Sequence, residues 1–337
     1  MATTLQSATI PTSNPDSAAQ LSALMTGAGV APLDQTGWIR VTGEDRVRWL
    51  NGMVTNSIQQ LAPGEACYNF VLNAQGRIQC DLTAYLLSDA ILLETSRDQI
   101  EKLLAHLNHF IIMDDVELAD ISDLRTGLLL AGPNAGKLLA AINLHTDELE
   151  SLAMVHITWQ SASIDLIHAY SPLAPKFEIW SDPATLNLVR DQLLTAEASN
   201  VSPETLDHLR ILEGTPKYGT DIRDKDLPQE TAQTRALHFT KGCYLGQEIV
   251  ERIRSRGNVH RTFSGFSLTG TLPPAGTTLE AEGKPVGELT SVAAIPLAAG
   301  PIQLALGYIR REALDRKLTL EYPGGTATPI ALPYPLP

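Results

Sequence analysis

The sequence predicts an α+β protein with two similar mixed parts followed by a small all-β domain. In the first two parts, short alternating apolar segments are interleaved with amphipathic helices, which favours an α+β sandwich over a parallel doubly wound sheet. From Phe263 onward, short apolar runs are separated by glycine and proline, with no convincing helix before Arg310, a pattern typical of a barrel. A length of 337 residues is enough for about two or three domains. We therefore expect domains at residues 30–125, 126–260 and 261–337.

The first part is expected to mix strands and helices closely. The helix prediction depends on apolar residues at helical spacing, and the strand predictions depend on alternation bounded by turn residues. In chain order we predict a strand at 38–43, a short helix from 44, strands at 68–72 and 78–87 joined by the turn 73–76, a strand at 91–94, and a helix over about 97–108.

The second part repeats this style without a visible residue-level repeat. Ser202 and Pro203 are a typical N-cap and first-turn pair, and they open a helix that we expect to end at Gly214. The other predicted elements are a strand from 128, a helix over 134–143, strands near 155–158, 163–167 and 176–180, and a helix over 183–194.

Composition limits the class of protein and its location. Lys and Arg number 25 against 38 Asp and Glu, a net charge of −13 that argues against general coating of nucleic acid. No Lys or Arg precedes Arg40, and no apolar stretch is long enough to span a bilayer, so we expect a cytoplasmic protein without membrane contact. We expect the residues up to Gln20 to form an irregular segment ahead of the first domain. The three cysteines show no CxxC spacing, so we expect neither a disulfide framework nor a metal site.

The most informative stretch is residues 241–248, Lys-Gly-Cys-Tyr-Leu-Gly-Gln-Glu, which we call the KGCY block. It leads into a predicted helix bracketed by Gly246 and Gly257, whose end carries arginines that include Arg254. Lys241 and the helix dipole would both favour the thiolate form of Cys243. The alternative is a capped surface helix with an inert cysteine and a solvated basic face. Because this basic group stands in an acidic protein, we expect an anion to dock there.

The KGCY block resembles the signature of the YgfZ family of folate-binding iron–sulfur cluster assembly proteins. That family is related to the aminomethyltransferase (T-protein) of the glycine cleavage system. Segments 41–43, 54–56, 61–64, 72–76, 209–214 and 218–221 also resemble the shared pattern. The resemblance implies a ring-like, three-domain aminomethyltransferase fold, with two ferredoxin-like parts and a C-terminal barrel. It also implies that tetrahydrofolate or a derivative is bound.

By that resemblance, Lys241 and Cys243 would line the folate site and Asn56 would form its N-terminal wall. Trp38 is a candidate for stacking on the pteridine, with core packing as the alternative. Arg254 and its neighbours would bind the folate carboxylates or an acidic partner.

Two departures from the relatives bear on the site. T-protein relatives carry paired aspartates after Gly-Gly, whereas this chain has Cys80 and Asp81. Asp81 is thus a candidate acid or base, with a hydrogen-bonding role as the alternative. Relatives also place a glutamate where this chain has Leu212. Glu213 is next to it but points about 100° away on a helix.

The leading hypothesis is a monomeric, tetrahydrofolate-binding accessory protein that assembles or repairs iron–sulfur clusters in client enzymes, with Cys243 as the reactive group. Three scattered cysteines are too few to hold a four-iron cluster permanently. The first alternative is a folate-dependent aminomethyl or one-carbon transferase that uses Asp81. The second is an RNA-contacting modification factor that uses the arginines.

Overall fold

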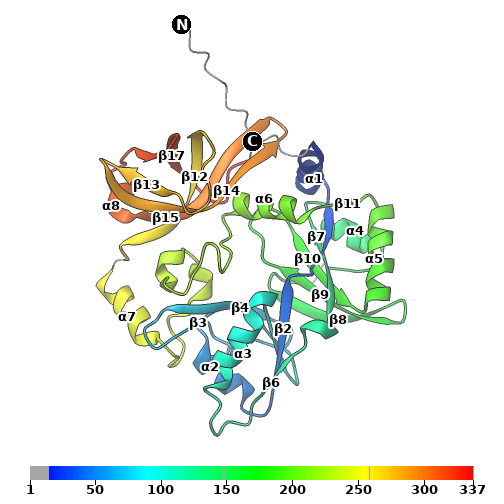
Figure 1. Cartoon of the computed structure of the whole chain (residues 1–337). Helices are drawn as coiled ribbons and strands as arrows, with labels where there is room; N and C mark the ends of the chain where they lie inside the picture. The colour runs from blue at the N-terminus through cyan, green and yellow to red at the C-terminus, as the bar shows by residue number, and fades with distance from the viewer. Residues whose placement is uncertain (1–14, 147–148, 258, 337) are drawn as a thin grey trace. The chain divides into compact units, whose positions relative to one another are not determined.

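The computed structural model describes residues 15–146, 149–257 and 259–336 (Figure 1). These residues form two compact units. The larger unit comprises Ala23–Asn200 and Lys217–Val259, and the smaller unit includes Val201–Pro216 and His260–Pro337. None of the described helices is long and apolar enough to cross a bilayer.

The first sheet of the larger unit is antiparallel and carries helices on one face. The helices α2 (Arg46–Met53) and α3 (Ile100–Asn108) pack through one apolar cluster onto this face. A 3-10 turn, η1 (Arg97–Gln99), leads into α3. The strand order is β3 (Ala66–Leu72), β4 (Ile78–Leu86), β5 (Ile91–Ser96), β2 (Thr36–Thr42) and β6 (Glu117–Asp120).

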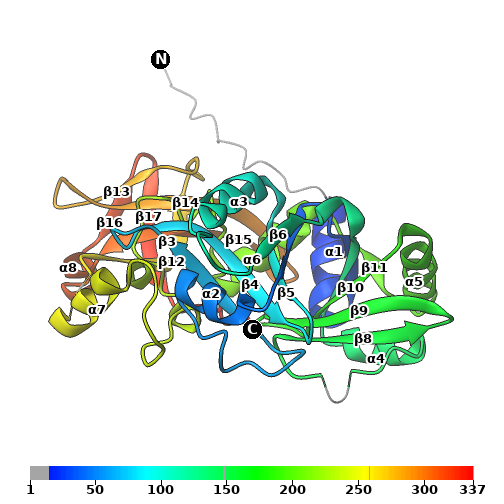
Figure 2. The same cartoon turned by 90° about the horizontal axis from the view of Figure 1, so that it is seen from below.

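The second sheet of the larger unit is antiparallel except for one short parallel pair, β1 with β11. Helices α4 (Ala135–Ala141) and α5 (Pro183–Thr195) lie beside it (Figure 2). Asp182 caps α5 by accepting from the N–H groups of Ala184 and Thr185. The strand order is β11 (Ser199–Asn200), β1 (Gly29–Pro32), β7 (Thr126–Ala131), β10 (Lys176–Ser181), β9 (Ala162–Ala169) and β8 (Ala153–Trp159).

The two sheets share a core of aromatic and aliphatic side chains. Trp38 of β2 is fully buried and meets Trp180 of β10 edge-to-face, with ring centroids 5.1 Å apart. Leu92 and Tyr85 of the first sheet and Met154 and Ile167 of the second join the same cluster. The larger unit is therefore one packed body in which each sheet carries its helices on the outer face.

The smaller unit contains a closed six-stranded barrel. Helix α6 (Pro203–Glu213) belongs to this unit; Ser202 caps its start, and Gly214, at φ 70°, ends it. Helix α8 (Arg311–Asp315) follows β15. The barrel order is β12 (Arg261–Gly270), β15 (Gly300–Arg310), β14 (Lys284–Leu297), β13 (Thr278–Ala281), β16 (Leu320–Tyr322) and β17 (Gly325–Ile330).

The predicted α+β class with a C-terminal barrel is confirmed. The expectation of an irregular lead-in up to Gln20 is wrong from residue 15, because α1 (Pro15–Thr26) is a helix that buries Leu21 and Leu24. Residues 1–14 lie outside the described part. The last helix of the larger unit, α7 (Gln247–Arg256), begins and ends at Gly246 and Gly257 as expected.

Candidate functional site

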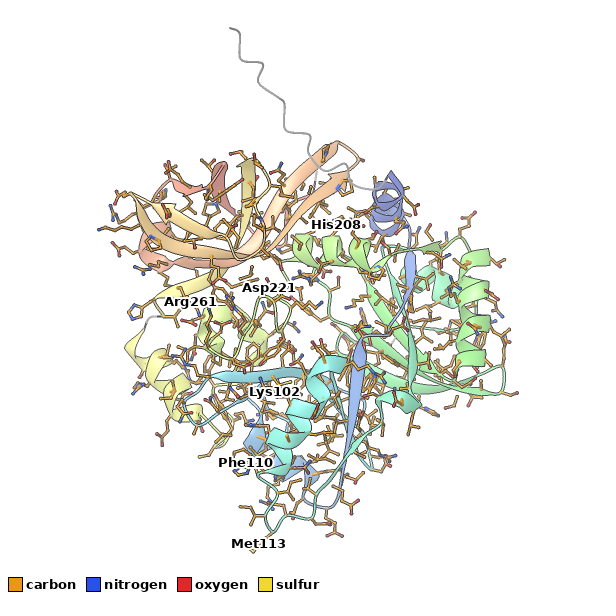
Figure 3. The ribbon with its side chains drawn as sticks, in the orientation of Figure 1. Lys102, Phe110, Met113, His208, Asp221 and Arg261 are labelled. Carbon is orange, nitrogen blue, oxygen red and sulfur yellow. The ribbon has the colours of Figure 1, made fainter. Side chains whose placement is uncertain are left out.

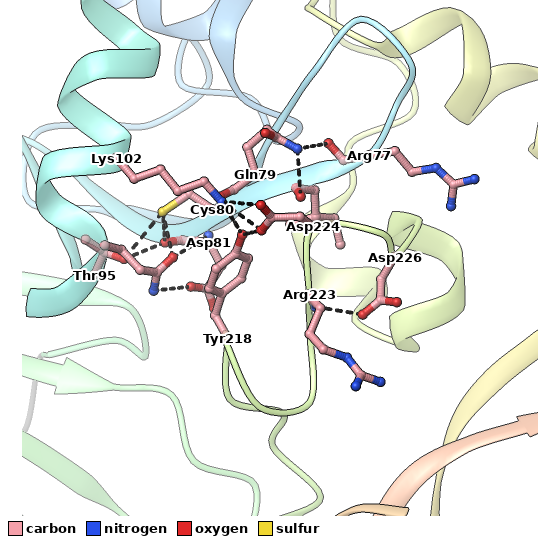
Figure 4. A network of polar contacts seen from close by, with 12 residues as sticks. Arg77, Gln79, Cys80, Asp81, Thr95, Lys102, Tyr218, Arg223, Asp224 and Asp226 are labelled. Atoms are coloured by element: carbon pink, nitrogen blue, oxygen red, sulfur yellow. Dashed lines mark hydrogen bonds and ion pairs between the residues drawn. The ribbon is translucent and has the colours of Figure 1, made fainter. Parts of the chain in front are cut away.

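Asp81 lies on β4 at the centre of a polar cluster in the larger unit. Its Oδ2 accepts a hydrogen bond from the Tyr68 hydroxyl at 2.7 Å, and its Oδ1 accepts one from the Gln99 amide at 3.1 Å. The pairing of β4 with β5 begins only at Thr83. At Asp81 side chains, not a strand partner, take the main-chain groups: the Thr95 hydroxyl donates to the main-chain carbonyl, and the Gln99 side chain accepts from the main-chain N–H. Asp81 is therefore held by side chains on both its main chain and its carboxyl group (Figure 4).

The environment of Asp81 favours its neutral form relative to water. Burial raises the pKa of the Asp81 carboxyl, while the hydrogen bonds from Tyr68 and Gln99 and the charge of Arg235 oppose that rise. Burial also raises the pKa of the Tyr68 phenol, so this hydroxyl stays a donor. A carboxyl group with increased proton affinity fits the acid-or-base role considered for Asp81. The same carboxyl group also makes hydrogen bonds, as the alternative hydrogen-bonding role of Asp81 requires.

An arginine lies between two tyrosine rings beside this carboxyl group. The Arg235 guanidinium carbon is 4.1 Å from the ring centroid of Tyr68 and 3.9 Å from that of Tyr170. Tyr170 follows β9 and is 37% exposed, so the cluster reaches the surface of the unit. A carboxyl group, a guanidinium and two phenol rings thus come together from four separate segments.

Asn56 fixes the Arg235 segment to the first sheet. Its amide nitrogen donates to the main-chain oxygens of Arg235 at 2.9 Å and Tyr68 at 3.2 Å. Its amide oxygen accepts from the N–H of Ser57 at 2.9 Å, and its own N–H donates to Asn69. Asn56, predicted to form a wall of the ligand site, is next to the Asp81 cluster and uses its amide to hold the main chain.

Lys241 is an internal clamp. Its ammonium donates to the main-chain oxygens of Asn51 and Val54 at 2.7 Å each, and to that of Asn56. All three N–H bonds of the ammonium therefore have acceptors, and the residue is 9% exposed. Burial lowers the pKa of Lys241 to about 8, against an opposing effect of Cys67. We correct the expectation that Lys241 offers its ammonium to a ligand or to Cys243: it is directed at the C-terminal end of α2.

Cys243 differs from the other two cysteines, all three of which lie in the described part of the chain. Its side chain is exposed, whereas Cys67 and Cys80 are buried. Burial raises the pKa of Cys67 to about 11 and raises that of Cys80 further still. Reaction with an outside thiol, metal or oxidant needs access and a thiolate, so Cys243 is the cysteine available for chemistry.

Close packing fixes the KGCY block in front of α7. Gly246 has φ +81°, and a Cβ there would lie 2.6 Å from the main-chain oxygen of Asn73. The glycine thus allows the block to approach the turn 73–76 of the β3–β4 hairpin. On α7, the Arg254 guanidinium stacks on Phe239 at 4.5 Å and lies 3.6 Å from Glu251. Arg254 therefore covers the surface of the unit near this block.

Two other predicted residues have different settings. Trp38 is fully buried: it meets Trp180 edge-to-face, and the Arg125 guanidinium is 4.5 Å from its ring centroid. We therefore correct the stacking expectation: Trp38 is a core residue, which was the stated alternative. Glu213, half-buried, is the last residue of α6 in the smaller unit, where the neighbouring Leu212 is fully buried.

A second polar network braces the loop that follows the smaller unit's helix α6. The Lys102 ammonium of α3 bonds both carboxylate oxygens of Asp224, at 2.7 and 2.8 Å. The Tyr218 hydroxyl contacts the same carboxylate and also lies 2.5 Å from the main-chain oxygen of Gln79. These contacts hold the loop against β4 close to Asp81 (Figure 4).

Sequence reasoning missed four members of the Asp81 cluster: Tyr68, Gln99, Tyr170 and Arg235. Only Tyr68 had a usable signal, because the predicted hairpin around the turn 73–76 brings its strand beside that of Asp81. Among the described residues, no group of three or more His, Cys, Asp or Glu side chains could hold a metal ion.

The chain matches two known domain families. The GCVT N-terminal domain covers residues 10–241, and the CAF17 C-terminal beta-barrel domain covers residues 259–334. The first match spans more than half of the chain and includes the segments that bring Asp81, Tyr68 and Arg235 together.

Several named proteins are similar along most of their length. A chloroplastic protein of Arabidopsis thaliana, At1g60990, whose name describes a transferase, is 27% identical over 299 residues, covering 87% of this chain and 68% of the relative. The aminomethyltransferase of a Nostoc species is 24% identical over 327 residues, covering 93% of this chain and 85% of the relative. The aminomethyltransferase of Frankia alni is 28% identical over 301 residues, covering 86% of this chain and 80% of the relative.

A solved structure shows the same fold. The glycine cleavage system aminomethyltransferase T from Bartonella henselae superposes with a TM-score of 0.83 at 22% sequence identity, covering 96% of this chain and 91% of that one. The mixed α/β fold with its C-terminal barrel is therefore that of the aminomethyltransferases. The chain belongs to the GCVT family and, with its CAF17 barrel, is a member of the YgfZ type.

Proposed function

We propose that this protein binds tetrahydrofolate or a derivative and assists the assembly or repair of iron–sulfur clusters in client enzymes of the cytoplasm. The observation that carries the proposal is Cys243, the exposed cysteine of the three, held on a block that is anchored at both ends. Lys241 anchors the start of the block to α2, and Gly246 packs its end on the turn 73–76. The match to the CAF17 barrel domain supports the link to cluster assembly.

The Asp81 cluster has the chemistry that a folate requires. The pterin carries N–H donors, for which a carboxylate with free lone pairs is an acceptor. The guanidinium of Arg235, held between the two tyrosine rings, suits the carboxylates of the molecule. When bound, the folate would supply a one-carbon carrier; Asp81, Tyr68 and Arg235 would hold and orient it.

Thiol exchange or transient metal contact at Cys243 is the step that we assign to this chain. It is tested by expressing Cys243→Ser in a cell that lacks the protein and measuring the activity of an iron–sulfur enzyme. We expect normal folding and lost rescue. The matched control is Cys67→Ser, which changes a buried thiol on β3 and should still rescue. Full rescue by Cys243→Ser would overturn the role of this thiol.

A second candidate is one-carbon transfer from or to an amine, and the setting of Asp81 favours it. A carboxyl group with raised pKa can take the proton that the amine loses. The relatives from Nostoc and Frankia are named aminomethyltransferases. Asp81→Asn would then abolish transfer even at folate concentrations that saturate the variant, whereas a wild-type protein without transfer from any amine donor would eliminate this candidate.

A further inference from the structure

Gln99 contacts Asp81 at two points that have opposite hydrogen-bonding character. Its Oε1 accepts from the Asp81 main-chain N–H at 3.4 Å, and its Nε2 donates to the Asp81 carboxylate Oδ1 at 3.1 Å. A main-chain N–H can only donate, so the end of the amide beside it must be the oxygen. The nitrogen is then the end that faces the carboxylate, and the orientation of the amide is determined.

A thiol holds the amide in that orientation. The Cys80 Sγ is 2.7 Å from Gln99 Oε1, with the thiol as donor. Burial raises the pKa of Cys80, so the thiol keeps its proton. Gln99 is itself 4% exposed, and it stands at the junction of η1 and α3. Its amide oxygen thus receives two donors, and rotating the amide would place two N–H groups against them.

We propose that Gln99 is a positioning residue that fixes the orientation and the proton affinity of the Asp81 carboxyl group, with Cys80 as the donor that fixes Gln99. The carboxylate is then held at Oδ1 by Gln99 and at Oδ2 by Tyr68, and each oxygen keeps a further lone pair as an acceptor for a ligand. This inference rests on the proposed function, because the orientation of the carboxylate serves the binding of the proposed folate ligand.

Removing the amide hydrogen bond should raise the proton affinity of Asp81. The Gln99 bond stabilises the charged form of the carboxylate and lowers its pKa against the effect of burial. A hydrogen bond to a charged group changes the proton affinity by about tenfold or more. Gln99→Met keeps the size and loses both contacts. Gln99→Glu keeps the shape and replaces the donor by an oxygen.

The test is a carbon-13 NMR titration of the Asp81 carboxyl group in the full chain, without ligand. We expect the midpoint to move to higher pH by about tenfold in proton concentration in both Gln99 variants. The matched control is Thr95→Val, which removes a bond of 2.7 Å to the Asp81 main-chain oxygen and leaves the carboxylate contacts in place. Its midpoint should stay at the wild-type value.

A midpoint that is the same in wild type and in both Gln99 variants overturns the positioning role, even if tetrahydrofolate binds. A shifted midpoint in a protein that does not bind tetrahydrofolate supports the positioning role and counts against the proposed folate function instead. If Gln99→Met fails to fold, the isosteric Gln99→Glu variant decides. An equal shift in Thr95→Val would assign the effect to general loosening of the strand and overturn the proposal.

Discussion

The ammonium of Lys241 donates to the main-chain oxygen of Val54, which lies 187 residues earlier in the chain and caps the C-terminal end of α2. The main-chain oxygens at a helix end have no partners within the helix, and a cation is favoured there by the helix dipole. One side chain therefore closes α2 and fixes the start of the KGCY block. This makes the lysine of the motif a structural requirement of the fold.

Lys241→Met should destabilise the larger unit by about 3 kcal/mol, because it leaves buried carbonyl groups without donors. Chemical denaturation followed by tryptophan fluorescence measures this change. Lys137→Met, which alters an exposed lysine on α4, is the control and should change the free energy of unfolding little. Equal free energies of unfolding for the two variants would contradict the stabilising role of the Lys241 hydrogen bonds.

Tetrahydrofolate affinity should depend on the Asp81 cluster and not on acidic residues elsewhere on the same sheet. Tyr68→Phe removes the donor to Asp81, and Asp81→Asn removes the carboxylate acceptor. We expect each to weaken binding at least about tenfold in a calorimetric titration. The control Asp89→Asn changes an exposed carboxylate that pairs with Arg40, and its affinity should equal that of wild type.

Affinity that none of these variants changes would place the folate elsewhere. Lys241→Ala is a poor probe for this question, because loss of the clamp would alter folding as well as any binding.

The pH dependence of stability should reveal a carboxyl pair between the two sheets. Glu94 of β5 accepts from the Tyr85 hydroxyl at 2.9 Å, and Glu178 of β10 accepts from the Trp180 indole at 3.1 Å. Burial, and then the charge of Glu178, raise the pKa of Glu94 from its ordinary 4.5 to about 8. Between these values the folded protein keeps a proton that the unfolded chain has lost. Its stability therefore falls as pH rises from 4.5 to 8.

Unfolding measured across this window should show a shallower slope in Glu94→Gln, which cannot ionise, than in wild type. Glu101→Gln changes an exposed carboxyl group on α3 and should keep the wild-type slope. A Glu94→Gln slope that matches wild type would mean that Glu94 is ionised in the fold.

Local patterns predicted much of the fold. The helix spacing of Ile100, Leu103 and Leu107 identified α3, and the Ser202–Pro203 and Gly214 signals identified α6. Short strands such as β1 and β6 were missed, because their pairing is decided by distant partners and not by local alternation. The helix α1 was missed for a similar reason: its sequence has little charge or periodicity, and burial of Leu21 and Leu24 accounts for its packing.

The site was harder to predict than the fold. Asp81 and Cys243 were found because they stand in recognisable motifs, but Gln99, Tyr170 and Arg235 reach Asp81 from segments that only the tertiary structure brings near. Lys241 shows the opposite failure, since a motif lysine suggests a ligand contact and its three acceptors lie on the main chain of α2 and the residues after it. The exposed apolar tip at Ile112 and Met113 also had no sequence signal (Figure 3).

Comparing alanine substitutions at the two glycines that bracket α7 separates the cost of backbone strain from the cost of close packing. Gly246 and Gly257 have φ of +81° and +91°, so alanine at either position costs about 1–2 kcal/mol in backbone strain. Among the described residues, a Cβ at Gly257 meets no atom within 4 Å, whereas a Cβ at Gly246 would lie 2.6 Å from the Asn73 oxygen and 3.0 Å from the Leu72 Cβ. Gly246→Ala should therefore cost about 1–3 kcal/mol more than Gly257→Ala in denaturant unfolding. Equal costs would mean that the turn 73–76 yields freely, and the KGCY block would then be anchored by Lys241 alone.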